Sequence, residues 1–116
     1  MSTEGRVPRP QGDYVPAVLH DGVVYTAGMT PRRDGVLAFT GAVGEGLDPD
    51  QARVAAGLAA GNALVAARSA TPSGAALRCL KMTVFIACTA DFTALSAVAD
   101  GASAVLVDEL GDVGRP

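Results

Sequence analysis

The stretch from Leu77 to Asp91, LRCLKMTVFIACTAD, constrains the fold more than any other part of the chain. Apolar and mixed positions alternate along it. The wholly apolar face consists of Leu80, Met82, Val84 and Ile86. This alternation, with many β-branched and aromatic residues, predicts one long strand that leads into a helix. Because an apolar strand face must be covered, we expect the two helices that flank it in the sequence to pack on that face.

The first of these helices is predicted between residues 48 and 69. Asp48 suits the N-cap, Pro49 suits the first helical position, and Gln51 completes a capping box with Asp48. The helix is rich in alanine, which lets it approach its neighbours closely. Asn62 lies on or beside the apolar stripe, and we expect its amide to be satisfied by backbone groups.

The second helix is predicted to begin after Asp91, which we assign as its N-cap, and to end at Gly111. Apolar residues recur at helical spacing between these two positions. They are Leu95, Val98, Ala102, Val105, Leu106 and Leu110. This spacing predicts one buried face.

The N-terminal half is predicted to contain three short strands, at residues 14–19, 23–29 and 36–39. His20-Asp21-Gly22 and the stretch Pro31–Gly35 supply the turns, because Asp-Gly is a strong hairpin signal. We therefore expect a three-stranded antiparallel meander, preceded by a flexible lead over residues 1–12.

The predicted order is three strands, a helix, a strand and a helix. Hairpin strands with helices gathered on one side give an α+β sandwich. The opposite sheet face would be bare, with Tyr25, Lys81, Thr83 and Phe85 as its residues. A bare face of this kind predicts a homo-oligomer.

Composition narrows the classes of function. The net charge of −3 and the pI of about 4.9 give the chain no overall attraction for phosphate, so we expect no nucleic-acid partner. Arg32-Arg33, the one adjacent basic pair, is expected to be solvated in a turn. No secretory leader and no run long enough to cross a bilayer is recognisable, so we expect a cytoplasmic protein without membrane association.

Few motifs in the sequence indicate a particular catalytic or binding chemistry. Cys79 and Cys88 lack metal-ligand spacing, and His20 is the only histidine, so we expect two buried thiols and no metal site. The glycine-rich stretch at residues 41–47 is not a phosphate-binding loop, because no Lys-Ser or Lys-Thr pair follows it. The residues alone therefore indicate an α+β domain and no particular reaction.

Four segments carry a resemblance to a known family. In order they are GDYVPAVLHDGVVYTAGMTPRRDG, the GAVGEGLD loop with the GNAL stretch of the following helix, KMTVFIACTADFT and DGASAVLVDELGDVGRP. Each is weak alone, but their order and spacing are specific. Together they resemble the longer-looped branch of the RidA family, also called YjgF/YER057c/UK114 or endoribonuclease L-PSP, from about residue 12 to the end.

The resemblance implies a single domain over residues 13–116 with a chorismate-mutase-like α+β sandwich. In that fold a mostly antiparallel sheet carries two helices on one face. It also implies a homotrimer with ligand clefts between subunits. Better-known members hydrolyse reactive imines and enamines to 2-keto acids and ammonia without a cofactor. The expected ligand is thus a small imine, enamine or keto acid that bears a carboxylate.

Five residues match positions near the family's cleft. Tyr14 matches a tyrosine that borders it, and Ala27 stands where many members have serine. Met29 stands where glutamine is usual, and Ser96 falls near an asparagine of the shorter branch. Arg115 matches the arginine of a Gly-Arg-His motif, which is not the arginine that binds substrate.

The family's carboxylate-binding arginine, a glutamate and the last two strands lie beyond the position of Pro116, so no catalytic residue is assigned. Two explanations are open. Either the sequence is part of a longer chain, or this member has lost the site. The cost of an exposed sheet edge and apolar surface favours the first.

Three hypotheses about activity follow. The first is an imine or enamine deaminase, for which the ordered motifs argue. The second is a non-catalytic member that binds a small molecule or a partner in the same cleft, which Ala27 and Met29 favour. The third is a ribonuclease, against which the acidic charge and the lack of a histidine-based acid–base pair argue.

Overall fold

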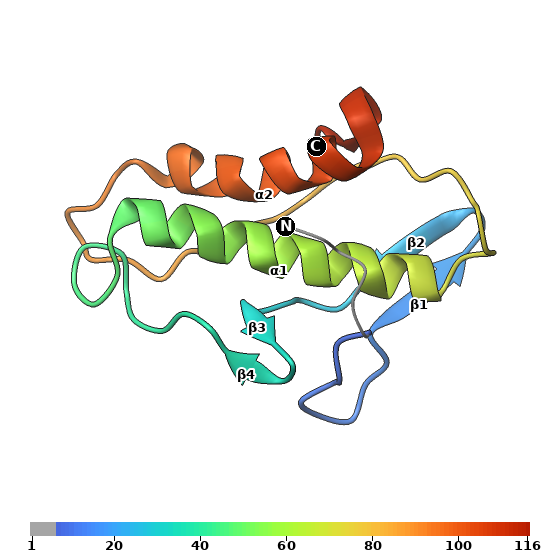
Figure 1. Cartoon of the computed structure of the whole chain (residues 1–116), viewed down its shortest axis with the longest axis horizontal. Coiled ribbons are helices and arrows are strands. Elements are labelled where there is room, and N and C mark those ends of the chain that lie inside the picture. The colour runs from blue at the N-terminus through green and yellow to red at the C-terminus, as the bar shows by residue number, and fades with distance from the viewer. Residues whose placement is uncertain (1–6) are drawn as a thin grey trace.

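The computed structural model describes residues 7–116, so the first half of the predicted N-terminal lead lies outside the described residues. Two helices lie side by side, and two small hairpins precede them in the chain (Figure 1). The class is α+β, as predicted. Among the described residues no helix is long and apolar enough to cross a membrane.

The first hairpin joins β1 (Ala17–His20) to β2 (Val23–Thr26) in an antiparallel pair. Asp21 and Gly22 form the two-residue turn with φ of 48° and 77°. Positive φ at both positions is the geometry that Asp-Gly favours, because its twist matches that of the strands. The predicted Asp-Gly hairpin is therefore confirmed.

The predicted three-stranded meander is wrong. β3 (Arg32–Arg33) pairs with β4 (Val36–Leu37) in a separate two-stranded sheet, and among the described residues β1 pairs with β2 alone. The cause is a second Asp-Gly turn at Asp34 and Gly35, with φ of 51° and 81°. This turn folds the chain back at once, so that Arg32 and Arg33 lie in a short strand and not in the turn.

α1 (Pro49–Ser69) begins and ends as predicted. Asp48 accepts a hydrogen bond from the backbone N–H of Gln51 at 2.8 Å, and the Gln51 side chain accepts one from the Asp48 N–H at 3.0 Å. This reciprocal pair satisfies two donors that a helix terminus would otherwise leave unpaired.

Asn62 of α1 is half-buried, and its Nδ2 donates to two carbonyl oxygens, that of Thr30 at 3.1 Å and that of Arg32 at 2.9 Å. The expectation of an amide satisfied by backbone groups is confirmed. The side chain ties the middle of α1 to the segment that joins β2 to β3.

Replacing Asn62 with leucine should lower the free energy of unfolding by about 1–3 kcal/mol, because two carbonyls lose their donor. Urea unfolding measures the change. In Asn62→Asp the shape is kept while a carboxylate faces the same carbonyls, so the loss should be at least as large. A leucine variant as stable as the parent would contradict the tether.

α2 (Leu95–Leu110) begins later than predicted. Its N-cap is Ala94, without a side-chain cap, so the assignment of Asp91 as the N-cap is wrong. The hydrogen bond from Thr89, together with one from the Asp91 backbone, lowers the pKa of the Asp91 carboxyl. Asp91 therefore stabilises the preceding turn, where Phe92 N–H donates to the Thr89 carbonyl. Gly111 ends the helix as predicted, with φ of 74°.

A 3-10 turn, η1 (Gly111–Gly114), follows α2. The predicted apolar face of α2 is largely confirmed, since Val98, Ala102 and Leu106 are buried, although Leu95 is 44% exposed. Ala102 and Leu106 pack on Ala60 and Leu64 of α1.

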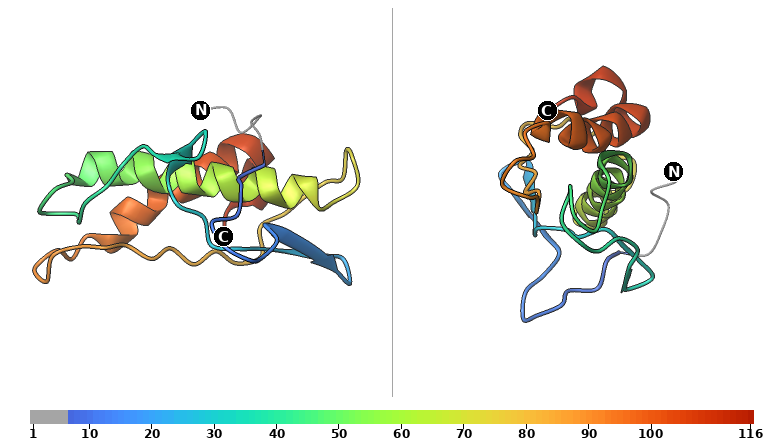
Figure 2. Two further views of the ribbon diagram at one scale, coloured as in Figure 1. Left: turned by 90° about the horizontal axis from the view of Figure 1, so that it is seen from below. Right: turned by 90° about the vertical axis from the view of Figure 1, so that its left-hand side faces the viewer.

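The stretch predicted as one long strand is extended but is not part of a hydrogen-bonded sheet (Figure 2). An isolated bridge pairs Cys88 with Val43 of the glycine-rich loop. Met82 and Val84 pack against the core formed by both helices, as expected. Leu80, however, is 65% exposed, because the side of the chain that faces the helices changes near Lys81. The prediction of a uniform apolar face is therefore wrong at Leu80.

Candidate functional site

A large groove is lined by the extended segment, the first hairpin and both helices. One wall is residues 22–31 and the other is residues 76–87. We call this space the central groove, and its volume is 1570 Å³. The helix residues that line it are Ala52, Ala55, Ala56, Ala59, Ala60, Ala63, Leu64 and Ala67 of α1 with Val98, Ala102, Leu106 and Leu110 of α2.

Small side chains explain the depth of the central groove. The face that α1 turns toward it is nearly all alanine, so the helix backbone lies close to the groove surface. The alanine-rich sequence of α1 predicted that this face would pack closely against neighbouring elements. In the described part of the chain Ala59 and Ala63 are instead half-buried, and neither of the two hairpin sheets covers them fully.

Two of the predicted site residues come together. Ala27 and Met29 both line the central groove, on the segment that follows β2. Tyr14 does not line it. Its side chain is 47% exposed, and its hydroxyl accepts a hydrogen bond from the Gln11 N–H at 3.1 Å. Ser96 lies in the first turn of α2 and is exposed.

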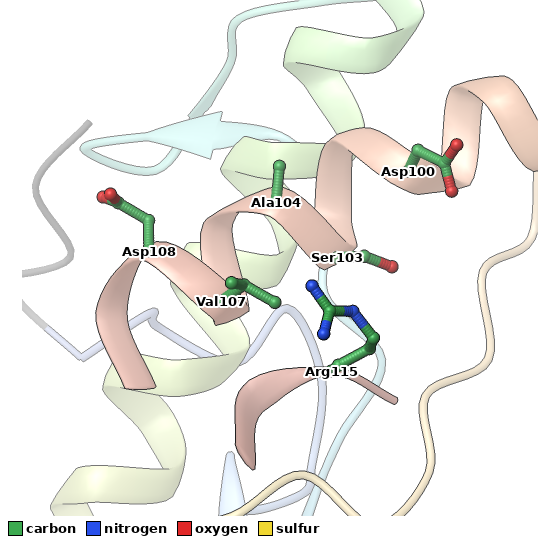
Figure 3. Close-up of a pocket in the computed structure, with 6 residues that line it drawn as sticks. All are labelled: Asp100, Ser103, Ala104, Val107, Asp108 and Arg115. Atoms are coloured by element: carbon green, nitrogen blue, oxygen red, sulfur yellow. The ribbon is translucent and has the colours of Figure 1, made fainter. Parts of the chain in front are cut away.

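Arg115 lies at a second, shallow pocket on α2, lined by Asp100, Ser103, Ala104, Val107 and Asp108 with Arg115 itself (Figure 3). Its guanidinium reaches toward Ser103, and its Nη1 lies 3.6 Å from Asp112 Oδ1. Within one copy of the chain, Arg115 is thus in a different pocket from Ala27 and Met29.

Two cationic residues of the central groove were not predicted as site residues. Arg78 and Lys81 belong to the wall at residues 76–87, while none of the aspartates and glutamates between residues 7 and 116 lines the groove. The sequence signal for Lys81 was present, because it is a charged residue at a mixed position of the alternating stretch. Lys81 is exposed because the extended chain turns a different set of alternate residues toward the helices before and after this point.

Metal ligands do not cluster in residues 7–116, where no group of three or more His, Cys, Asp or Glu side chains could hold an ion. Cys79 and Cys88 are free thiols and are half-buried. Cys79 packs beside the helix core and Cys88 beside Val43, so both pack as small apolar side chains.

The fold recurs in solved structures. A protein of unknown function from Agrobacterium tumefaciens, Atu1372, superposes with a TM-score of 0.84 at 32% sequence identity, covering 91% of this chain and 69% of that chain. A protein from Shewanella oneidensis MR-1, named as a candidate endoribonuclease, superposes with a TM-score of 0.78 at 22% identity, covering 96% and 74%.

The likeness to the Shewanella protein shows a shared fold and no more, because the sequence identity is 22%. No protein-family model and no curated protein sequence matches the chain. The first likeness goes further, because the identity is higher and extends over most of both chains. The chain belongs to the same protein family as Atu1372 of Agrobacterium tumefaciens.

Proposed function

We propose that the chain is a member of the RidA family and hydrolyses reactive imines or enamines to 2-keto acids and ammonia. The observation that carries the proposal is the ordered series of four motifs from about residue 12 to the end. Two findings support it. The α+β class agrees with the family's fold, and a fold neighbour bears the name endoribonuclease, by which this family is also known.

The chemistry needs few protein groups. An imine carbon is already electrophilic, so the protein has to hold the substrate and place a water beside that carbon. A bidentate arginine is the usual partner of a substrate carboxylate. We assign that role to no residue of this chain, since Arg115 contacts Asp112 and matches a different arginine of the family.

We further propose that three copies of the chain form a trimer, with the cleft between subunits. In the single chain, Tyr14 and Arg115 lie outside the central groove. When subunits assemble, side chains from different elements of neighbouring subunits meet at one cleft. The bare face at Phe85, which is 93% exposed, is the surface that we assign to the trimer.

A second candidate is a member of the same family that binds a keto acid without turnover. Ala27 and Met29 favour it, because both put apolar side chains where the family usually has polar ones. Such a site would keep its shape but would lack the polar groups that hold the attacking water in place. Calorimetric titration with a 2-keto acid, alongside the activity assay, separates binding from catalysis.

Ribonuclease activity is the weakest candidate. His20 Nε2 does lie 3.1 Å from Asp21 Oδ2, so a histidine–carboxylate pair exists, although none was expected. Both side chains are largely exposed, at 73% and 88%, in the tip of the first hairpin. Neither lines the central groove, so this pair faces solvent and not an RNA-sized cleft.

The test is an imine generated in place by an amino-acid oxidase, with ammonia release followed over time. We expect the protein to accelerate the release above the uncatalysed rate. Tyr14→Phe, which removes one hydroxyl, should lower kcat/KM by roughly tenfold if Tyr14 borders the cleft. The control Ser73→Ala, which removes an exposed hydroxyl in the loop after α1 and outside both pockets, should leave kcat/KM unchanged. No acceleration by the folded protein would overturn the proposal.

A further inference from the structure

Two Asp-Gly turns occupy matched positions in the two hairpins. Asp21-Gly22 joins β1 to β2, and Asp34-Gly35 joins β3 to β4. Both aspartates have positive φ, of 48° and 51°, and both turns are exposed. In residues 7–116 neither the Gly22 N–H nor the Gly35 N–H donates a hydrogen bond to another backbone group. Each turn therefore places a free backbone amide directly after an aspartate side chain.

An aspartate and the amide that follows it can react with each other. The glycine nitrogen attacks the side-chain Cγ of the preceding aspartic acid, the N–H proton and the carboxyl hydroxyl leave together as water, and a cyclic succinimide forms. Water then adds to either carbonyl of the ring. Addition at one carbonyl restores aspartate, and addition at the other gives isoaspartate, in which the main chain runs through Cβ and Cγ. Glycine permits the attack best, because it has no Cβ to obstruct the approach.

The two turns differ in how easily they open. Ring closure requires rotation about the Cα–C bond of the aspartate, and a paired hairpin opposes that rotation. The rate therefore follows the fraction of molecules in which the turn is open. β1 and β2 are four residues each and pair along their whole length, whereas β3 and β4 are two residues each. Fewer backbone hydrogen bonds have to break to open the turn at Asp34.

Side-chain contacts change this difference only slightly. Asp21 Oδ2 lies 3.1 Å from His20 Nε2, but both side chains are largely exposed, so the contact holds the carboxyl group weakly. Within the described chain the Asp34 carboxyl group has no hydrogen bond or ion pair. One contact opposes opening of the second turn, since Arg32 Nη1 donates to the Gly35 carbonyl at 2.7 Å. This single exposed bond offsets only part of the difference in strand length.

We propose that Asp34-Gly35 is a site at which the folded protein forms a succinimide and accumulates isoaspartate, and that the longer hairpin protects Asp21-Gly22. The modification needs no other reactant than water. It is independent of the proposed hydrolysis of imines.

The modification acts on the segment between β2 and α1. Isoaspartate adds one main-chain carbon to a two-residue turn, so the pairing of Arg33 with Val36 is displaced. Arg32 in the same hairpin is tied to α1, because its carbonyl accepts from Asn62 Nδ2 at 2.9 Å. Isomerisation at residue 34 therefore loosens the contact between this hairpin and the helix.

Matched amide variants measure the difference between the turns. Asp34→Asn and Asp21→Asn form the same succinimide with loss of ammonia in place of water, so each completed conversion raises the intact mass. Asparagine tolerates positive φ, so both turns should be kept. We expect residue 34 to convert at least roughly fivefold faster than residue 21. In concentrated urea both turns are open, and the two rates should become similar. A native ratio no larger than the ratio in urea would overturn the proposal.

The parent protein is tested by peptide mapping after storage at physiological temperature. Enzymatic methyl esterification of isoaspartate with labelled S-adenosylmethionine should label the peptide that contains residue 34 much more than the peptide that contains residue 21. Arg32→Gln removes the hydrogen bond to the Gly35 carbonyl, so it should raise the rate at residue 34 roughly threefold and leave residue 21 unchanged. Equal labelling of both peptides, or a rate at residue 34 that Arg32→Gln does not alter, would contradict control of the reaction by turn opening.

Discussion

Replacing Gly101 with alanine is expected to destabilise the protein by about 3 kcal/mol, enough to unfold much of a marginally stable domain. The sign of the effect is the informative part. In the interior of an exposed helix the same change would be stabilising by roughly 1 kcal/mol, because alanine is the better helix former. The expected loss thus reflects a tertiary contact that overrides helix propensity.

The contact is the crossing of the two helices. A Cβ on Gly101 of α2 would overlap the backbone carbonyl of Arg53 on α1, which cannot move aside without displacing the helix. Gly57 faces the same crossing, where an added Cβ would lie 3.1 Å from the Gly101 carbonyl oxygen. At this crossing Arg53 Nη1 also donates to the Ala97 carbonyl at 2.9 Å.

Thermal or urea unfolding followed by circular dichroism measures the effect. Gly28→Ala is the matched control, because an added Cβ there meets nothing within 4 Å and Gly28 is not in the left-handed region. It should remain within about 0.5 kcal/mol of the parent. If Gly101→Ala were as stable as this control, the close helix crossing would be wrong.

Local signals in the sequence predicted local structure well. The capping box at Asp48 and Gln51, the Asp-Gly turn after His20 and the end of α2 at Gly111 each depend on a few neighbouring residues. The same rule, applied to Asp34-Gly35, would have predicted the second hairpin. The error was to treat that pair as part of a longer turn.

Pairing between distant segments was not predictable in the same way. The alternation in the stretch from Leu77 onward indicates an extended chain, and the chain is extended. Alternation does not say whether a neighbouring strand is present, because hydrogen-bond partners are supplied by other parts of the fold. The change of side near Lys81 is likewise set by packing against the helices.

The candidate site was likewise only partly predictable from the sequence. Ala27 and Met29 were selected by resemblance, and they share the central groove. The cations Arg78 and Lys81 were not selected, because a charge in an alternating stretch is usually a solvated residue. Only the placement of this wall opposite the first hairpin makes them groove residues.

Replacing Phe85 with glutamate is expected to dissociate the proposed trimer. Phe85 is 93% exposed, and its neighbours Val84 and Ile86 turn toward the helices, so its ring points away from them. Leu80 and Tyr25 are also exposed large apolar residues, at 65% and 59%. An aromatic anchor at an interface typically contributes about 2 kcal/mol or more, so each contact should weaken at least roughly thirtyfold.

Light scattering coupled to size-exclusion chromatography measures the assembly. The parent should elute with three times the mass of its single chain, which is 11.6 kDa for the 116 residues, and Phe85→Glu with the mass of one chain. Val36→Glu is the matched control, because Val36 is 69% exposed on β4 and lies outside the face assigned to the interface. A parent protein that is monomeric at high concentration would exclude the trimer. Dissociation by both variants would show that added charge alone, and not loss of the Phe85 contact, separates the subunits.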